Sequence, residues 1–424
     1  MRITIVAPGS QGDVRPYVAL GAGLQADGHR VRVATHADFA GLVSGQGLAF
    51  HALAGNLETL MRDRQVGSAL AGGNPLSQLM LMRSKIISLV EGWIRDCRDA
   101  CREADLVMGG LGGVIAGQPV AEKLGIPFVQ AWLVPFTPTR AYPAASFSAI
   151  GGWLGGRLNR LSHIVGWQWL AWPIHRAAVN RARRAMLGLP PAPFWNGPLE
   201  MLERTGAPVL YGFSSHVIPR PPDWDTRIHI TGYWFLDSPA GWQPPSDLVD
   251  FLQAGPPPVY VGFGSMSHGD PEAASRLVLQ ALEMAGQRGI LLSGWGGLSR
   301  VELPDSVFMV GAVPHSWLFP QVAAAVHHGG AGTTAAGLRA GTPTVVVPFI
   351  SLDQAFWGRR VAALGAGVRP IPAARLTAET LAGAIATAVG DPAMGRTAAE
   401  LGARIRAEDG VAAAVAVIRN LFSE

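Results

Sequence analysis

The sequence predicts an α/β protein made of two facing doubly wound, Rossmann-like domains. Apolar strand-like runs alternate with helical stretches along the chain, and this alternation starts afresh after a stretch rich in proline and glycine. The length of 424 residues fits two to three domains at about 150 residues each. Charged residues make up 15% and hydrophobic residues 49%, which excludes a disordered chain.

The N-terminal region begins with one βαβ unit. A strand over residues 3–7 is followed by a polar turn, a helix from 16 to about 26, and a strand over 31–34. Parallel pairing of two such strands requires the helical crossover. Apolar runs at 106–108, 114–124 and 127–129 continue the same pattern.

A second unit of this kind begins after the proline-rich stretch. Its predicted strands and helices, in order, are 259–261, helix 271–286, 290–292, 308–310, 324–326, helix 333–339 and 343–347. We therefore expect an N-terminal domain over 1–237, a linker over 238–257 and a C-terminal domain over 258–424, with the possibility that the last helix packs back on the first domain. Ligands of such sheets bind beyond the carboxyl ends of the strands, which here are the turns after Ala7, Val261 and Val326.

The charge of the chain says little about a macromolecular partner. The formal net charge is +4, and lysine occurs only at Lys85 and Lys123, so arginine supplies nearly all of the positive charge. The arginines are scattered, which favours anionic ligands over nucleic acid, and no nucleic-acid partner is expected. Cys97 and Cys101 cannot build a disulfide framework, and neither a signal peptide nor a membrane span is predicted, so we expect a cytoplasmic protein.

The strongest local motif lies between an apolar strand and a helix, at residues 327–334 with the sequence HHGGAGTT. Glycines let the backbone approach a ligand, and free amides at a helix N-terminus attract negative charge. A histidine at the end of the strand adds a further donor. The motif therefore predicts an anion site, and the missing GKS/T and GxGxxG patterns exclude a P-loop and argue against NAD.

The first turn, residues 9–16 with the sequence GSQGDVRP, places Asp13 at the mouth of the predicted cleft. Aspartate near a helix start often serves only as a cap, because it accepts backbone hydrogen bonds there. A carboxylate that faces an anion site across a cleft could instead act as a general base. Both interpretations of Asp13 stay open at this point.

Residues 151–195 between the two units differ from the rest of the chain. They combine five tryptophans with most of the clustered arginines. These residues could form an apolar acceptor pocket or a membrane-surface patch, or they could be a helical hairpin whose tryptophans pack on the sheet. The composition permits peripheral contact with anionic lipid without requiring it.

Several motifs together resemble those of metal-independent glycosyltransferases of the GT-B fold, family 1, most of all the sterol 3β-glucosyltransferase group of bacteria and fungi. The first turn is similar to the group's GSRGDVQP. The other motifs are YGFS at 211–214 through PRP at 219–221, HITGYWF at 229–235, VYVGFGSM at 259–266, SGWGG at 293–297, PHSWLF at 314–319, the turn at 327–334, and DQAFWG at 353–358.

The resemblance implies that the C-terminal domain holds a nucleoside diphosphate sugar and the N-terminal domain holds the acceptor, with Asp13 in the place of the catalytic base. The residues that it implies for donor binding are Ser10, Gln11, Gly264, Ser265, Trp295, Val313, His327, Gly329, Gly330, Ala331, Gly332, Thr333, Asp353 and Gln354. No metal and no resident cofactor are expected, because the nucleotide sugar, a UDP-sugar or dTDP-sugar, is a co-substrate.

Three departures from related motifs bear on the donor. Ala335 stands where plant relatives carry a carboxylate for the ribose, so UDP and dTDP are not told apart. Ala312 replaces their base-stacking tryptophan, which leaves Trp295 or the backbone near Val313 as candidates. One additional residue within 349–352 makes the sugar contact of Asp353 less certain than that of Gln354.

The resemblance thus implies an inverting transfer of a hexose, with UDP-glucose favoured, to a hydroxyl of a lipophilic acceptor such as a sterol, triterpenoid or polyketide. One alternative is a dTDP-deoxysugar transferase, such as a rhamnosyltransferase that acts on a natural product or a hydroxy fatty acid. The other two alternatives are a nucleotide-sugar 2-epimerase and a catalytically silent partner of another transferase. The pair Asp223 and Asp225 copies a metal-binding DxD motif, but it lies in a proline-rich segment and we interpret it as a chance match.

Overall fold

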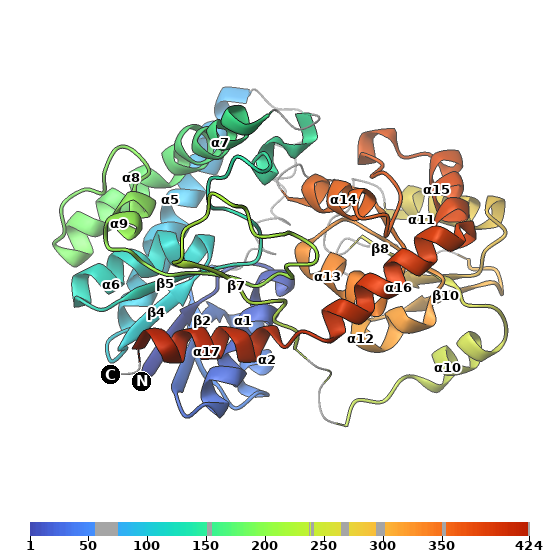
Figure 1. Ribbon diagram of the computed structural model, residues 1–424, viewed down its shortest axis with the longest axis horizontal. Coiled ribbons are helices and arrows are strands. Elements are labelled where there is room, and N and C mark those ends of the chain that lie inside the picture. The colour runs from blue at the N-terminus through green and yellow to red at the C-terminus, as the bar shows by residue number, and fades with distance from the viewer. Residues whose placement is uncertain are drawn as a thin grey trace.

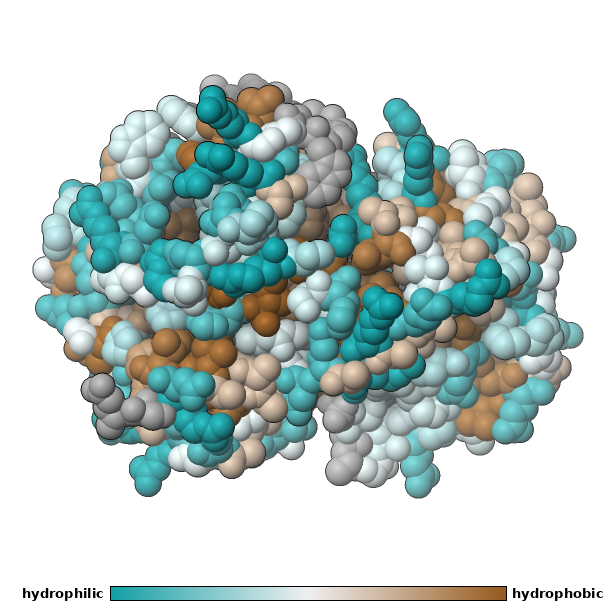
Figure 2. Space-filling model, viewed as in Figure 1, coloured by the Kyte–Doolittle hydropathy of each residue, from teal (hydrophilic) through white to brown (hydrophobic). Residues whose placement is uncertain are grey.

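Two parallel sheets, each covered by helices, form two lobes that meet along a furrow (Figures 1 and 2). The computed structural model describes residues 1–55, 75–150, 155–236, 238, 241–263, 271–293, 302–349 and 353–422. This architecture confirms the predicted fold class of two Rossmann-like domains.

The N-terminal sheet has, within the described residues, seven parallel strands in the order β3-β2-β1-β4-β5-β6-β7. They are β1 (Arg2–Val6), β2 (Arg30–His36), β3 (Ala49–Leu53), β4 (Leu106–Gly109), β5 (Phe128–Trp132), β6 (Val209–Tyr211) and β7 (Ile228–Ile230). The strand order reverses direction at β1, which pairs with β2 on one side and β4 on the other. The turn after β1 therefore lies at the switch point where such sheets bind ligands.

Helices pack on both faces of this sheet (Figure 1). They are α1 (Gln11–Ala26), α2 (Ala40–Ser44), α5 (Pro75–Ala100), α6 (Gln118–Leu124), α7 (Gly156–Val165), α8 (Trp172–Ala182) and α9 (Pro198–Arg204), with the π-helical turns η2 (Gly113–Gly117), η4 (Gly166–Ala171) and η5 (Arg183–Leu187). The predicted start of the first helix at residue 16 is wrong. Helix α1 begins at Gln11, because Ser10 and Asp13 bond to each other and cap it.

The C-terminal sheet has five parallel strands among the described residues, in the order β10-β9-β8-β11-β12. They are β8 (Val259–Gly262), β9 (Gly289–Leu292), β10 (Val307–Val310), β11 (Ala324–His327) and β12 (Thr344–Val346). Its helices are α10 (Ser246–Gln253), α11 (Pro271–Met284), α12 (His315–Leu318), α13 (Ala331–Ala340), α14 (Gln354–Ala363), α15 (Ala378–Gly390), α16 (Pro392–Arg406) and α17 (Gly410–Phe422). Helix α13 begins two residues before the predicted residue 333, so Gly332 and Thr333 lie in its first turn.

The last helix leaves the C-terminal lobe and packs against the N-terminal one (Figure 1). A side-chain methyl of Val411 in α17 lies so close to Gly23 of α1 that a Cβ at position 23 would be 2.2 Å from it. Arg419 donates to Asp27 at 3.1 Å. Helix α10, which lies within the predicted linker, packs on the C-terminal sheet through its buried Leu248.

The tryptophan-rich segment divides between core and surface. Trp167 and Trp172 are buried in the N-terminal core, whereas Trp169 and Trp195 are 60% and 56% exposed. Trp153 lies outside the described residues. Within the described ranges, every helix is too short or too polar to cross a lipid bilayer.

Candidate active site

The glycine-rich turn joins the buried end of β11 to the N-terminus of α13. Gly330 is the N-cap residue, and the amide of Thr334 donates to its carbonyl at 2.9 Å. The amides of Ala331, Gly332 and Thr333 precede that first helical bond and have no partner within the helix. Free amides at the positive end of a helix dipole can bind an anion, so the geometry is compatible with the anion site that the motif predicts.

The neighbouring glycine amide is already engaged. The N–H of Gly329 donates to Nδ1 of His327 at 3.0 Å, so it holds the histidine in place and is not free for a ligand. Gly329 has a φ of +88°, and a Cβ there would lie 2.8 Å from the carbonyl oxygen of Gln354. Only glycine fits this position, because the turn must pass directly over the start of α14.

His327 ends β11 directly before this turn. Its side chain is fully buried, and burial lowers its pKa to about 3, helped by the neighbouring His328 and His315. The ring is therefore neutral, and because Nδ1 accepts from Gly329, Nε2 carries the hydrogen. Nε2 is buried without a hydrogen-bond partner among the described residues, so it is a donor available to an anion.

A second histidine, His315, acts on the pKa of His327 and belongs to the PHSWLF motif of the sequence. The ring of His315 stacks on Phe319 at a centroid distance of 4.3 Å, and its Nε2 is 3.4 Å from the hydroxyl of Tyr260. Burial lowers the pKa of His315 to about 4, and the positive charge of Arg15 lowers it further. Arg15 belongs to α1, so the two lobes contribute charged and polar groups to the same region.

Arg15 was not assigned a role from the sequence. Its guanidinium is half-buried, its Nη2 contacts the carbonyl of Leu236 at 3.4 Å, and burial lowers its pKa. No described carboxylate forms an ion pair with it, so the charge is not neutralised within the described chain. The signal that could have found it is its spacing from Gln11, because residues four apart share one face of a helix.

Asp13 has the capping role, one of the two that the sequence left open. Its Oδ2 accepts from the backbone N–H of Ser10 at 2.8 Å and from the Ser10 hydroxyl at 2.9 Å, so it stabilises the first turn of α1. Oδ1 has no hydrogen-bond partner among the described residues. The residue is exposed at the cleft, and partial desolvation of its carboxyl by the surrounding protein raises its pKa, against the opposing effects of Ser10 and His36.

The carboxylate and the anion site face one another. Helices α1 and α13 are in contact, and a Cβ at Gly332 would lie 3.9 Å from the backbone of Gly12. Asp353, the N-cap residue of α14, has its pKa raised to about 6 by burial and then by the negative charge of Asp13. Asp13 and Asp353 thus approach the same space from the two lobes.

The remaining predicted donor residues differ in their surroundings. Gln354 is buried, and its Oε1 accepts from the N–H of Phe349 at 2.8 Å. This bond holds the backbone at Phe349 near the first residue of α14. Gln11 is exposed at the start of α1, and Val313 is half-buried just before α12. Gly264, Ser265 and Trp295 lie outside the described residues.

The DxD pair has a structural role. Asp223 accepts from the hydroxyl of Thr139 at 2.6 Å and from the N–H of Arg140 at 2.8 Å, and Asp225 pairs with Arg227 at 2.6 Å. These bonds hold the loop between β6 and β7. In the described part of the chain, no three His, Cys, Asp or Glu side chains group together as metal ligands.

The chain has two facing Rossmann-like domains, with a helix N-terminus that can bind an anion on one and a carboxylate on the other. This is the arrangement of GT-B glycosyltransferases. Residues 3–143 match the family model of the glycosyltransferase family 28 N-terminal domain, and residues 296–418 match the erythromycin biosynthesis protein CIII-like C-terminal domain. Sterol 3-beta-glucosyltransferase UGT80B1 of Arabidopsis thaliana is 38% identical over 98% of this chain and 67% of its own length. The chain belongs to the GT-B family 1 glycosyltransferases, in the group of the sterol 3β-glucosyltransferases.

The fungal relatives are much longer than this chain. Sterol 3-beta-glucosyltransferase of Cryptococcus neoformans var. neoformans serotype D is 37% identical over 99% of the chain, which spans 27% of that protein. Among solved structures, the glycotransferase of kitacinnamycin has a TM-score of 0.72 at 22% identity, covering 99% of this chain and 98% of its own. The calicheamicin glycosyltransferase CalG4 has a TM-score of 0.71 at 19% identity, covering 100% and 98%. The solved structures share the fold.

Proposed function

We propose that this chain transfers a hexose from a nucleoside diphosphate sugar, with UDP-glucose favoured, to a hydroxyl of a sterol or a similar lipophilic acceptor. The observation that carries the proposal is the buried Nε2 donor of His327 beside the free amides of α13, with Asp13 on the opposite lobe. A buried donor without a partner is costly, and a diphosphate oxygen would satisfy it. The acceptor class comes from the names of the relatives.

The proposed reaction is a single in-line displacement. Oδ1 of Asp13 takes the proton of the acceptor hydroxyl while the hydroxyl oxygen bonds to the anomeric carbon. The bond from that carbon to the diphosphate oxygen breaks, and its electron pair leaves with the nucleoside diphosphate. Attack from the side opposite the leaving group inverts the anomeric centre. Burial raises the pKa of Asp13 and so strengthens it as a base.

The positive end of α13, the Nε2 hydrogen of His327 and the guanidinium of Arg15 would stabilise the charge that grows on the departing diphosphate. We propose that these groups act without a metal ion. The corresponding test is turnover after treatment with EDTA, which the proposal expects to leave the rate unchanged.

A dTDP-sugar is the second candidate for the donor. The buried Ala335 provides no carboxylate for the ribose hydroxyls, and a uridine nucleotide would gain nothing at that position over a deoxythymidine one. The solved structure of SsfS6 from Streptomyces sp. SF2575, a relative in fold, is complexed with thymidine diphosphate. Competition of UDP and dTDP for the site separates the two donors.

The direct test is incubation of the purified chain with UDP-glucose, or with dTDP-glucose, and a pool of sterols, followed by mass spectrometry. A product 162 mass units heavier than a sterol, the mass of an added hexose residue, supports the proposal, and NMR of the anomeric proton tests inversion. Donor binding without any product from sterols, polyketides or polyphenols would overturn the transfer.

A further inference from the structure

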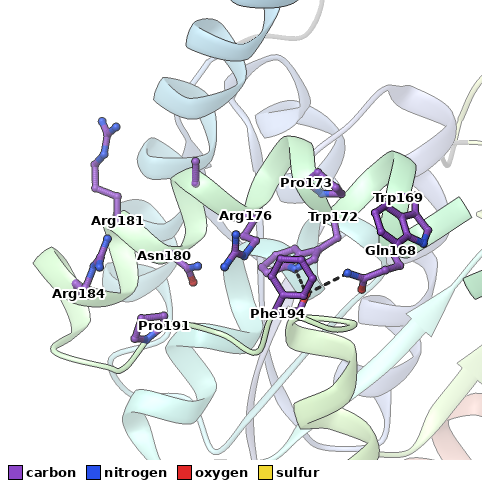
Figure 3. Close-up of a pocket in the computed structure, with 11 residues that line it drawn as sticks. Gln168, Trp169, Trp172, Pro173, Arg176, Asn180, Arg181, Arg184, Pro191 and Phe194 are labelled. Carbon is purple, nitrogen blue, oxygen red and sulfur yellow. Dashed lines mark hydrogen bonds between the residues drawn. The ribbon is translucent and has the colours of Figure 1, made fainter. Parts of the chain in front are cut away.

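The loop that follows α8 and η5 holds two aromatic rings outward. The carbonyl of Phe194 accepts from Nε2 of Gln168 at 3.1 Å and from Nε1 of Trp172 at 3.2 Å (Figure 3). Oε1 of Gln168 accepts from the N–H of Asn196 at 2.6 Å. These bonds fix the backbone of the loop, yet Phe194 and Trp195 are 53% and 56% exposed. The rings are thus presented to solvent by a rigid support.

A third exposed ring joins them. Trp169 is 60% exposed, and its ring lies 6.0 Å from that of Trp195, which in turn lies 5.3 Å from the ring of Phe194. Large rings that cluster on the surface lose the free energy that burial would give. Tryptophan combines an apolar body with one N–H donor, so such a group suits the boundary between water and lipid.

Beside the rings lies a cavity of about 570 Å³ with a positively charged lining. Residues at a helical spacing along η4, α8 and η5 line it, among them Trp169, Arg176, Arg181 and Arg184 (Figure 3). The guanidinium carbon of Arg176 lies 4.8 Å from the ring centroid of Phe194. Its Nε is buried and has no hydrogen-bond partner among the described residues, so the described chain supplies no acceptor for this atom.

The surrounding sequence provides almost no negative charge. Residues 155–197 contain six arginines and neither aspartate nor glutamate. Arg183 is buried and pairs with Glu122 at 2.6 Å, and Arg181 reaches Glu91 of α5 at 3.3 Å. The next acidic residue along the chain, Glu200, is paired with Arg204. The cavity therefore keeps a net positive charge.

We propose that this surface, which we call the docking face and define as Trp169, Phe194 and Trp195 with Arg176 and Arg184, binds the surface of an anionic lipid bilayer. The rings enter the headgroup boundary, and the cavity takes an anionic headgroup. A second copy of the chain fits poorly, because two docking faces in contact would place the same positively charged arginines against each other. The binding itself is independent of the sugar transfer; only its purpose, access to acceptors held in a membrane, rests on the proposed function.

The experiment is cosedimentation of the full chain with vesicles of phosphatidylcholine alone or with phosphatidylserine, in the absence of any donor or acceptor. We expect binding to the anionic vesicles that weakens with salt. The double variant Arg176→Gln/Arg184→Gln should bind them about thirtyfold more weakly, which corresponds to about 2 kcal/mol at about 1 kcal/mol per arginine. The triple variant with Trp169, Phe194 and Trp195 changed to alanine should lose binding to the anionic vesicles.

The matched control is Arg369→Gln/Arg396→Gln, which removes the same charge from exposed positions of the C-terminal lobe. If this control loses as much affinity as the docking-face variant, net charge explains the binding and the proposal is wrong. Failure of the unchanged chain to bind anionic vesicles overturns it as well. Self-association that disappears in the triple variant would assign the face to a second copy instead. Because no sugar donor is present, none of these results depends on the proposed transfer.

Discussion

Replacement of Asp13 by asparagine separates its two roles. The amide oxygen of asparagine can still accept from Ser10, so α1 keeps its capped first turn. A proton acceptor at the cleft is lost, however. General base catalysis contributes about 10²–10⁴-fold to a rate, so kcat should fall by that factor, which corresponds to roughly 3–5 kcal/mol of barrier. The dissociation constant of the nucleotide sugar should change little.

The assay measures kcat with UDP-glucose and a sterol, donor affinity by calorimetry, and thermal stability. Asp391→Asn is the matched control, because Asp391 caps α16 through the N–H groups of Ala393 and Met394, at 2.8 and 3.3 Å, in the C-terminal lobe. Both variants should lose at most about 1 kcal/mol of stability, and only the first should lose turnover. A kcat within threefold of the unchanged chain would refute the assignment of Asp13 as base.

Gly9→Ala perturbs the same carboxylate from its other side. Gly9 has a φ of +152°, and a methyl group there would lie 2.6 Å from Oδ2 of Asp13. The carboxylate must move, so kcat should fall. In the background of Asp13→Asn the same change should have much less effect on kcat, because the two substitutions act through one group. Full additivity of the two losses would contradict this.

Three further changes test the rest of the site. His327→Gln keeps an N–H group near the position of Nε2, so it should bind the nucleotide sugar more tightly than His327→Ala does. The affinity of His327→Ala for the nucleotide sugar should fall about tenfold to a hundredfold in calorimetry. Equal affinities of the two variants would contradict a hydrogen bond to the diphosphate. Arg15→Gln should weaken donor binding by a similar factor, whereas Arg30→Gln at the far end of the N-terminal sheet should not. Burial and, second to it, the charge of Asp13 raise the pKa of Asp353 to about 6, so Asp13→Asn should lower this pKa. A carboxyl titration followed by NMR that shows no shift would contradict their proximity. The sign for stability follows: with a folded pKa of about 6 above the unfolded value of 3.8, Asp353 makes the unliganded chain more stable as the pH falls from 7 toward 4.

The sequence by itself determined the fold class and located the glycine-rich turn at which we propose that an anion binds. Buried parallel strands have short apolar runs in their sequence, and each glycine that lets a turn approach a ligand can be identified in the sequence. The positions of β11, the turn and α13 could therefore all be predicted. Short strands such as β6 and β7 lack that signal, because three residues are too few to show a period. The predicted start of α1 at residue 16 is too late. Proline is common at the first position of a helix, but the reciprocal bonds of Ser10 and Asp13 begin this helix at Gln11.

Only the tertiary structure decided which groups meet. The charge of Arg15 acts on His315, and the charge of Asp13 acts on Asp353. Both effects join residues hundreds of positions apart, and no local pattern encodes such a proximity. The sequence also could not tell that the amide of Gly329 serves His327. The same limit applies to the tryptophans: Trp167 and Trp169 are two residues apart, yet one is in the core and the other in solvent. Burial depends on what packs against a side chain, and that is settled only when the whole chain has folded.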